Sequence, residues 1–282
     1  KGDYLNIVGV VYHPKNQAAP FVAEKTVALL KELGVETWMV SAWDSIELRR
    51  KASEAELIIT VGGDGTILRT ANAVIPGTTC ITGINLGRLG FLTEVSAEDT
   101  GEAIPALVRG EGWIDERALL QAELTLPGDG PDAPRQHFTA LNDIVVARGE
   151  VTRIIHIETR INGDLLTTYR ADGVILATAT GSTGYALAAG GPVIYPSSQD
   201  YLLVPILPHL GLGYNMVLPA DSEVQLQILN THMATLNVDG HTSCSLPDGA
   251  SITIRHSPHT IRFLRTLPKI PFYSTIEKRL KV

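Results

Sequence analysis

The sequence predicts an α/β domain followed by a mainly antiparallel β domain. Apolar and amphipathic segments alternate over about the first 95 residues, whereas short strand-like segments separated by turn residues follow from about residue 117 to 257. The last 20 or so residues become helical again. We therefore predict a Rossmann-like parallel sheet in residues 1–116, a sandwich-like β domain that would bind the ligand in 117–257, and a C-terminal tail, 258–282, that returns to the first domain.

The first region is built from repeated strand and helix units. Tyr4–Tyr12 is a valine-rich apolar run, typical of a strand buried on both faces. Pro20–Leu33 carries its leucines on one helical face, and Gly34 is placed to end that helix. Further strands are expected at 36–40, 57–61 and 79–84, and further helices at 45–56 and 66–74. This alternation implies a parallel sheet with helices on its faces.

The second region consists of short segments that end at turn residues. Turn clusters such as Pro127–Pro131 and Asn162–Asp164 separate them, as in antiparallel hairpins. We expect one short helix here, at 184–190, and a last helix over 275–280 that Ser274 would cap. The predicted strands lie at 119–126, 144–147, 154–161, 165–169, 174–177, 224–229, 235–238 and 251–255.

Composition argues against several classes of protein. The 282 residues carry a net charge of −7 without a Lys/Arg-rich run, which does not suit a nucleic-acid binder. No apolar run approaches the roughly 18–20 residues of a membrane span. Cys80 and Cys244 are the only cysteines, so neither a disulfide framework nor a thiolate metal site is expected. We expect a cytoplasmic protein with small-molecule ligands, no nucleic acid and no membrane partner.

The strongest functional signal is the stretch Leu57–Arg69. An apolar strand runs into the turn Gly62–Thr66 (Gly-Gly-Asp-Gly-Thr), and a helix follows, so free N–H groups and the positive helix end point at one place. Asp64 would repel phosphates there unless it binds a cation or takes a proton from the attacking group. The pattern indicates phosphoryl transfer, although neither the Walker nor the dinucleotide fingerprint fits. A tight turn in which Asp64 caps the helix is the alternative.

Four further clusters suit a nucleotide. Gly87–Phe91 places an arginine between glycines and an aromatic ring beside them, for a phosphate and a base. Asn142-Asp143 suits the hydroxyls of a ribose, and Arg170–Asp172 forms a cation–acid pair before a strand. Thr178–Tyr185 offers hydroxyls and glycines for close approach. Each cluster is also compatible with an ordinary turn or loop. The eight histidines show no metal-binding spacing.

Together these segments resemble the NAD kinase family. The Gly-Gly-Asp-Gly element alone is shared with diacylglycerol, sphingosine and 6-phosphofructo-kinases, but the ordered set of motifs is specific. It comprises His13-Pro14, Gly62–Thr66, Asn85–Leu92, Leu141–Asp143, Ala171–Gly173, Thr180–Tyr185, Ala189–Pro192, Val204-Pro205, Pro208-His209 and Val238–Gly240. The resemblance implies phosphorylation of the adenosine-ribose 2′-hydroxyl of NAD, with ATP or polyphosphate as donor, to give NADP. It also implies an α/β domain and a β domain with the active site in the cleft between them.

The same resemblance implies roles for individual residues. Asp64 would be the general base, or would orient the hydroxyl, and Mg²⁺ would arrive with ATP, so no side chain is assigned as its ligand. The phosphate-binding residues would be Gly63, Gly65, Thr66 and Arg88. The NAD site would comprise Asp64, Gly65, Phe91 against the adenine, Asn142 and Asp143 at a ribose, Asp172 with Arg170 at the nicotinamide end, and Thr183, Gly184 and Tyr185. Homodimers or homotetramers are implied, in which a neighbouring subunit can complete the site.

Four positions depart from the family pattern. Asp143 replaces the familiar Glu, Ala179 a Pro, Gly184 an Ala and Leu210 a Ser. These departures concern substrate preference and leave Asp64 in place. Two alternatives remain open: a lipid or sphingoid-base kinase of the same superfamily, and a non-catalytic NAD-binding sensor.

Overall fold

The chain forms two compact units. A computed structural model describes residues 5–87, 90–130, 133–149, 153–209, 213–229 and 233–280. One unit contains Lys1–Arg117 and Ile261–Val282, and the other contains Ala118–Thr260. Strands β6 (Trp113–Thr125) and β17 (Ser251–Arg265) each begin in one unit and end in the other. Through β17 the C-terminal tail becomes part of the first unit.

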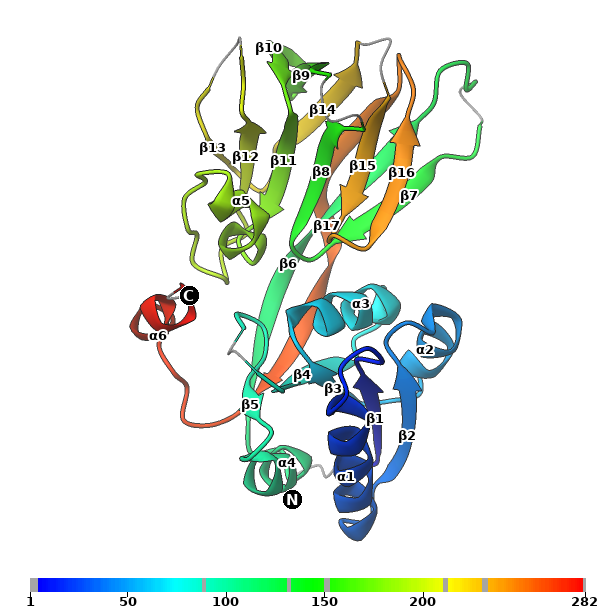
Figure 1. The fold of residues 1–282 in the computed structure, drawn as a ribbon, viewed down its shortest axis with the longest axis vertical. Helices are drawn as coiled ribbons and strands as arrows, with labels where there is room; N and C mark the ends of the chain where they lie inside the picture. Colours follow the sequence, from blue (N-terminus) through cyan, green and yellow to red (C-terminus); the bar gives the residue numbers. More distant parts are fainter. Residues whose placement is uncertain are drawn as a thin grey trace. The chain divides into compact units, whose positions relative to one another are not determined.

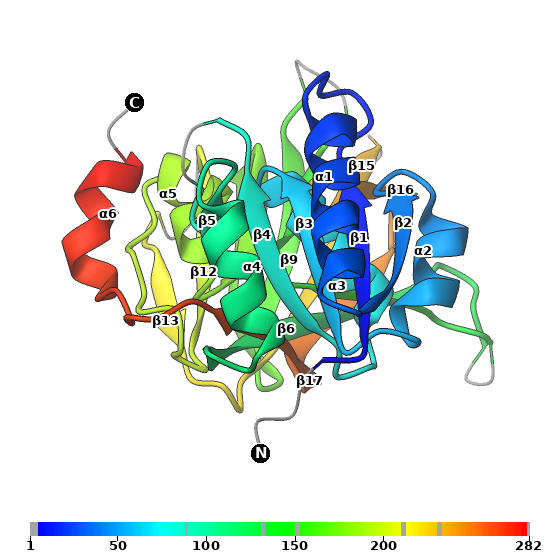
Figure 2. The same cartoon turned by 90° about the horizontal axis from the view of Figure 1, so that it is seen from below.

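The first unit is a parallel sheet with helices on both faces. Its strand order is β17-β4-β3-β1-β2, with β5 beside β4, and every neighbouring pair is parallel. Helices α1 and α4 lie on one face and α2 and α3 on the other (Figures 1 and 2). Besides β17, the elements are β1 (Ile7–Tyr12), α1 (Ala19–Glu32), β2 (Glu36–Ser41), α2 (Ser45–Ala52), β3 (Leu57–Gly62), α3 (Asp64–Val74), β4 (Cys80–Asn85), β5 (Val95–Ser96), α4 (Thr100–Val108) and α6 (Phe272–Leu280).

Burial explains why the apolar runs of this unit become strands. All six residues of β3 are buried, because neighbouring strands flank it and helices cover both faces. On the face of α1 and α4, Val10 and Ile59 pack with Leu30 and Ile104 in one apolar cluster. In the sheet, β2 lies on one side of β1, whereas β3 and then β4 lie on the other side. The carboxyl ends of β1 and β3 therefore form the topological switch point, where open α/β sheets bind ligands.

The second unit consists of two antiparallel sheets. One has the order β13-β12-β11-β8-β15-β16, and the other contains β10-β9-β14-β17 with β6 beside β17 and β7 beside β6. Residues of both sheets, including Tyr169, Leu176 and Ile252, form one buried core. The predicted α/β plus β fold class is confirmed. The elements are β7 (Gln136–Ala140), β8 (Asp143–Arg148), β9 (Ile155–Ile161), β10 (Asp164–Ala171), β11 (Gly173–Thr178), a 3₁₀ turn (Gly181–Thr183), α5 (Tyr185–Ala188), β12 (Tyr201–Ile206), β13 (Met216–Leu218), β14 (Glu223–Ile228), β15 (Ala234–Val238) and β16 (Thr242–Leu246).

Several elements differ from the sequence prediction. Helix α4 was not predicted, since Gly101 and Pro105 weaken its local signal; it is held by burial of Ile104 and Leu107 against the sheet. Strands β7, β12, β13 and β16 were also missed, and β17 continues ten residues beyond its predicted end at Arg255. Long-range pairing decides these strands rather than local propensity. In the described part of the chain no helix has the length and apolarity needed to cross a membrane.

Candidate active site

The glycine turn lies at the switch point of the parallel sheet. His13 donates its backbone N–H to the carbonyl of Val61 (3.0 Å), so the end of β1 lies beside the end of β3. Helix α3 begins at Asp64, and its N-cap Gly63 provides no side-chain cap. A Cβ added to Gly63 or Gly65 would meet no atom within 4 Å, which leaves space for a ligand at both glycines. This arrangement suits the approach of an anionic group to the first turn of α3.

Thr66 faces inward from this turn. Its side chain is fully buried, and its backbone N–H donates to the carbonyl of Gly63 (2.9 Å). A Cβ on Gly62 would overlap the Thr66 hydroxyl, so glycine at 62 is required for this packing. Within the described residues the hydroxyl has no hydrogen-bond partner. Thr66 thus shapes the turn from inside, while Gly63 and Gly65 present its outer surface.

Asp64 holds the loop that follows β4. Its carboxylate accepts three backbone hydrogen bonds, from Phe91 at Oδ2 (2.9 Å) and from Leu92 and Thr93 at Oδ1 (3.1 and 3.3 Å). A carboxylate can accept about four hydrogen bonds. One acceptor position on Oδ2 therefore has no partner among the residues that the structure describes. Asp64 is consequently a carboxylate held in a fixed orientation, with one acceptor position left for a further hydrogen bond.

Gly90 makes this anchoring possible. A Cβ at position 90 would overlap the Asp64 carboxylate, so any larger residue must displace either the loop or the acid. The Gly90 N–H donates to the Thr93 hydroxyl (3.1 Å), which closes the loop on itself. The predicted phosphate ligand Arg88 lies outside the described residues. The predicted adenine contact Phe91 is half-buried, and the Arg279 guanidinium lies 5.8 Å from its ring centroid.

In the second unit, Asp239 organises the predicted ribose-binding turn. Its buried carboxylate accepts the backbone N–H groups of Leu141 (2.8 Å), Asn142 (2.7 Å) and Asp143 (3.1 Å). Asp239 takes a positive φ of 50°, which brings its side chain back over this turn. The arrangement parallels that of Asp64: one carboxylate holds three successive N–H groups. Asp239 belongs to the motif Val238–Gly240, from which no role for its carboxylate could be predicted.

Asn142, Asp143 and Gly184 are brought together. The ideal Cβ position of Gly184 lies 3.6 Å from Asn142 Nδ2 and 3.9 Å from Asp143 Oδ2. Gly181 packs so closely on the Asn142 carbonyl that a Cβ there would overlap it. The Asn142 Oδ1 atom is buried and has no hydrogen-bond partner within the described residues. Such an orphaned acceptor is suited to a ligand hydroxyl.

Thr183 and Tyr185 flank this group. The Thr183 hydroxyl donates to the carbonyl of Thr180 (3.2 Å), and Tyr185 begins the short helix α5 with 48% of its surface exposed. An exposed aromatic side chain beside polar groups is available for a ligand or a second subunit. The structure therefore gathers five of the predicted NAD-binding residues in one region of the second unit.

Arg170 and Asp172 lie at the other end of strand β11. In the register of the sheet Asp143 is opposite Ala177, so Asp172 is about 17 Å away along the strand. Asp172 forms an ion pair with Arg148 (3.1 Å), which the sequence did not suggest, whereas Arg170 donates to the ring of His156 (3.1 Å). These two predicted residues do not join the Asn142 cluster within this unit.

The buried Asp143 side chain is electrostatically unusual. Burial, and secondly the neighbouring Asp239 carboxylate, raise the pKa of Asp143 to about 7. Burial also raises the pKa of Asp239, while its three N–H donors oppose that rise. We assign the shared proton to Asp143, because Asp239 is the carboxylate stabilised by hydrogen bonds. At neutral pH Asp143 can then donate a hydrogen bond to a sugar oxygen as well as accept one.

This shift predicts a pH-dependent effect of Asp143→Asn. Because the pKa of Asp143 is raised in the folded state, the native protein keeps a proton between about pH 4 and pH 7 that the unfolded chain has already lost. The contribution of this group to the free energy of unfolding therefore falls as pH rises through that window. The variant cannot titrate. We expect the difference in free energy of unfolding, variant minus wild type, to be larger at pH 8 than at pH 5 by at least about 1 kcal/mol, so that the variant is relatively more stable at the higher pH. Urea denaturation at both pH values measures this, and Asp164→Asn, at the exposed start of β10, controls for loss of one charge. An equal difference at both pH values would contradict the assignment.

Sequence reasoning took Gly90 only as one of the glycines beside Arg88, and it gave no role to Arg148, Asp239, Arg265 or Arg279. The last two contact the loop that Asp64 holds: Arg265 Nη1 donates to the Leu92 carbonyl (2.7 Å) and Arg279 Nη1 to that of Phe91 (2.9 Å). The dipeptide Asp239-Gly240 is typical of a turn, and Gly90 belongs to a cluster of glycines in the sequence. The arginines carry no local signal, because their partners lie far away in the sequence.

Comparison with known proteins places this fold among nucleotide-using phosphotransferases. Residues 22–112 match the ATP-NAD kinase N-terminal domain, and residues 141–266 match the ATP-NAD kinase C-terminal domain. A NAD kinase of Dehalococcoides mccartyi (strain CBDB1) is 48% identical over 274 residues, which cover 97% of this chain and 95% of that protein. A NAD kinase of Chloroflexus aurantiacus (strain ATCC 29366 / DSM 635 / J-10-fl) is 38% identical, covering 98% of this chain and 99% of that protein. The chain belongs to the NAD kinase family.

Solved structures share the fold. A NAD kinase from Archaeoglobus fulgidus in complex with ATP superposes with a TM-score of 0.76 at 28% identity, covering 97% of this chain and 98% of that one. Yeast NADH kinase complexed with NADH gives a TM-score of 0.80 at 23% identity, covering 94% of this chain and 84% of that one. The second likeness concerns the fold alone.

Proposed function

We propose that this protein transfers the γ-phosphate of ATP to the 2′-hydroxyl of the adenosine ribose of NAD, forming NADP and ADP. The observation that carries the proposal is Asp64, an anchored carboxylate at the switch point with one acceptor position available on Oδ2. Family membership and the ATP bound to the Archaeoglobus fulgidus enzyme support the choice of donor.

Asp64 would act as the general base. As the hydroxyl oxygen forms its bond to the γ-phosphorus, the hydroxyl proton passes to Oδ2 and the bond to the ADP oxygen breaks. The open turn at Gly63 and Gly65 would bind phosphate through the first N–H groups of α3. Because the three backbone donors fix the carboxylate before the substrate arrives, little reorganisation is needed in the transition state.

The Asn142 cluster would bind the dinucleotide. Asn142 Oδ1 needs a donor, and protonated Asp143 offers one, so the pair complements a sugar with hydroxyl groups. Thr183, Gly184 and Tyr185 would line the same pocket, and Phe91 would contact the adenine. We also propose a homodimer or homotetramer in the cytoplasm, in which Asp172 and Arg170 would serve the nicotinamide end of a dinucleotide held by a neighbouring subunit.

Mg²⁺ would be carried by ATP. Among the described residues no three His, Cys, Asp or Glu side chains form a group that could hold a metal ion. Bound by the substrate phosphates, the ion would neutralise charge on the transferred group.

The direct test is formation of NADP. Purified protein is incubated with NAD and Mg-ATP, and NADP is measured with an NADP-specific dehydrogenase; parallel reactions replace ATP by polyphosphate, NAD by NADH, or NAD by a diacylglycerol. We expect NADP with ATP. Phosphorylation of the lipid but not of NAD would establish the lipid-kinase alternative. Binding of NAD by calorimetry without any product would establish the sensor.

A further inference from the structure

Two arginines reach the Asp64 carboxylate through the peptide groups of the loop that it holds. Arg279 Nη1 donates to the Phe91 carbonyl (2.9 Å), and the other end of that peptide group, the Leu92 N–H, donates to Asp64 Oδ1 (3.1 Å). Arg265 Nη1 donates to the Leu92 carbonyl (2.7 Å), and the Thr93 N–H of that peptide donates to the same Oδ1 (3.3 Å). Two successive peptide groups thus each join a guanidinium to one carboxylate oxygen.

Each series of hydrogen bonds, from arginine through a peptide group to the carboxylate, is polarised in one direction. A cation at the carbonyl end polarises a peptide group and strengthens the hydrogen bond that its N–H donates, by about 10–30% per bond. Partial burial of these hydrogen bonds limits the competition from water. Both of these hydrogen-bond chains end on Oδ1, whereas among the described residues Oδ2 accepts the Phe91 N–H. Because Oδ1 accepts two strengthened hydrogen bonds, Oδ2 is the carboxylate oxygen that remains available for a proton.

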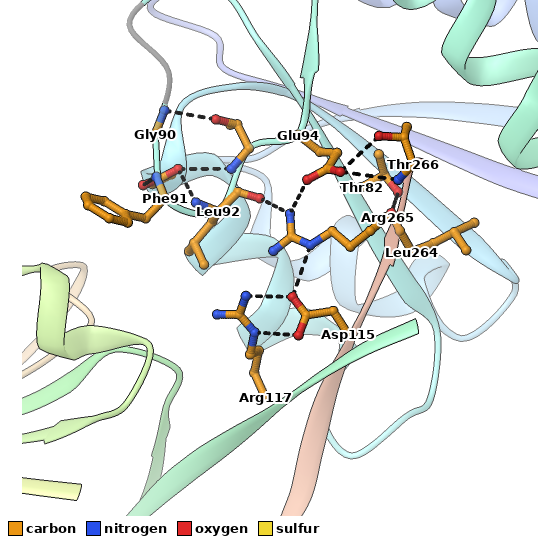
Figure 3. A network of polar contacts seen from close by, with 12 residues as sticks. Thr82, Gly90, Phe91, Leu92, Glu94, Asp115, Arg117, Leu264, Arg265 and Thr266 are labelled. Carbon is orange, nitrogen blue, oxygen red and sulfur yellow. Dashed lines mark hydrogen bonds and ion pairs between the residues drawn. The ribbon is translucent and has the colours of Figure 1, made fainter. Parts of the chain in front are cut away.

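The two arginines are held in different ways. Arg265 is almost completely buried, and Figure 3 shows it between Leu92, Glu94 and Asp115, with Nη1 3.3 Å from Glu94 and Nε 3.2 Å from Asp115. Asp115 in turn pairs with Arg117 (2.6 Å). Arg279 comes from the C-terminal helix α6 and is only half-buried. The contact that Arg265 makes with the loop therefore lies in the core of the first unit. The contact that Arg279 makes depends on packing of the C-terminal helix.

We propose that Arg265 and Arg279 are positioning residues for Asp64, each acting through one peptide group of loop 91–93. They fix the orientation of the carboxylate and direct its available acceptor position to Oδ2. The C-terminal helix thereby contributes to catalysis through Arg279, which acts on Asp64. This inference rests on the proposed kinase function.

Arg279→Met in the full-length protein is the principal test. It removes the donor while keeping an unbranched apolar chain, and we expect kcat for NADP formation to fall about tenfold with KM for NAD and for ATP within about twofold of wild type. Arg279→Lys, which retains a cation, is expected to recover part of the loss. Arg262→Met is the matched control, because Arg262 pairs with Glu116 (3.4 Å) and makes no contact with the loop that the structure shows.

A double-mutant cycle distinguishes positioning from general support of the fold. If Arg279 acts through Asp64, Arg279→Met should change kcat by less than about twofold in the Asp64→Ala background. The same tenfold loss in that background, or a rise in KM alone, would overturn the proposal for Arg279. Arg265→Met would remove the ion-pair partner of Glu94 and one of the two arginines at Asp115, so Arg265 is tested as Arg265→Lys. Since one ammonium cannot reproduce all three contacts, kcat should fall at least about fivefold at unchanged KM, and a wild-type kcat would exclude Arg265.

The outcomes separate this inference from the proposed function. A wild-type protein that makes no NADP refutes the kinase assignment itself. A wild-type protein that makes NADP while Arg279→Met matches it in kcat refutes only the positioning role.

Discussion

Replacing Asp64 by asparagine is expected to lower kcat for NADP formation by about 10²–10⁴-fold. An amide cannot take the hydroxyl proton, and its NH₂ group must face at least one of the three backbone donors that now meet a carboxylate oxygen. Loss of one of these hydrogen bonds should also lower the free energy of unfolding by about 1–3 kcal/mol. Steady-state kinetics with NAD and Mg-ATP and thermal unfolding measure the two effects separately.

Asp44 provides the matched control for this substitution. Its side chain caps helix α2 by accepting the Glu47 N–H (3.1 Å), a task that asparagine performs about equally well. Asp44→Asn should therefore retain both activity and stability. Near-normal turnover of a folded Asp64→Asn protein would show that another group takes the proton.

Gly90→Ala is expected to have the second largest effect. The new methyl group would overlap the Asp64 carboxylate, so either the acid or the loop must move. Displacement of a catalytic group by about 1 Å can cost about 100-fold in rate, and overpacking costs about 1–3 kcal/mol of stability. We expect kcat to fall by at least about tenfold, a value below that limit because the loop can absorb part of the shift.

Gly101→Ala tests whether this effect is specific to the site. Gly101 lies in the first turn of α4, and a Cβ there would meet nothing within 4 Å. The same substitution should leave kcat unchanged and alter stability by no more than about 1 kcal/mol, in the stabilising direction. Equal activity of the two alanine variants would contradict the close packing between Gly90 and Asp64.

Much of the α/β unit could be predicted from local patterns. The valine-rich β1, the largely apolar β3 and the glycine turn carry strong signals, because a strand buried on both faces consists mainly of apolar residues. Strand β16, with the sequence Thr-Ser-Cys-Ser-Leu, carries almost none; it exists because β15 pairs with it along its whole length. Helix α4, interrupted by Pro105, is stabilised by its buried face.

The site shows the same division. The types of residue at positions 63–66 and 142–143 indicated phosphate and ribose chemistry, since glycine, carboxylate and amide groups have restricted uses in such turns. Nothing in those segments indicated Asp239, Arg265 or Arg279, which lie far from their partners in sequence. Sequence spacing also could not show that Asp172 lies at the opposite end of β11 from Asp143, because that separation follows from the register of the sheet.

The fold class, the family and the chemical character of the two clusters follow from short runs of residues and can be inferred without coordinates. The contacts of the acids depend on folding, because Asp64 bonds to loop 91–93 and Asp239 bonds to the Asn142 turn, both far away in the sequence. Which oxygen of Asp64 is available, and which of two adjacent buried aspartates keeps a proton, depends on hydrogen bonds and burial. Those quantities arise only when distant segments pack together.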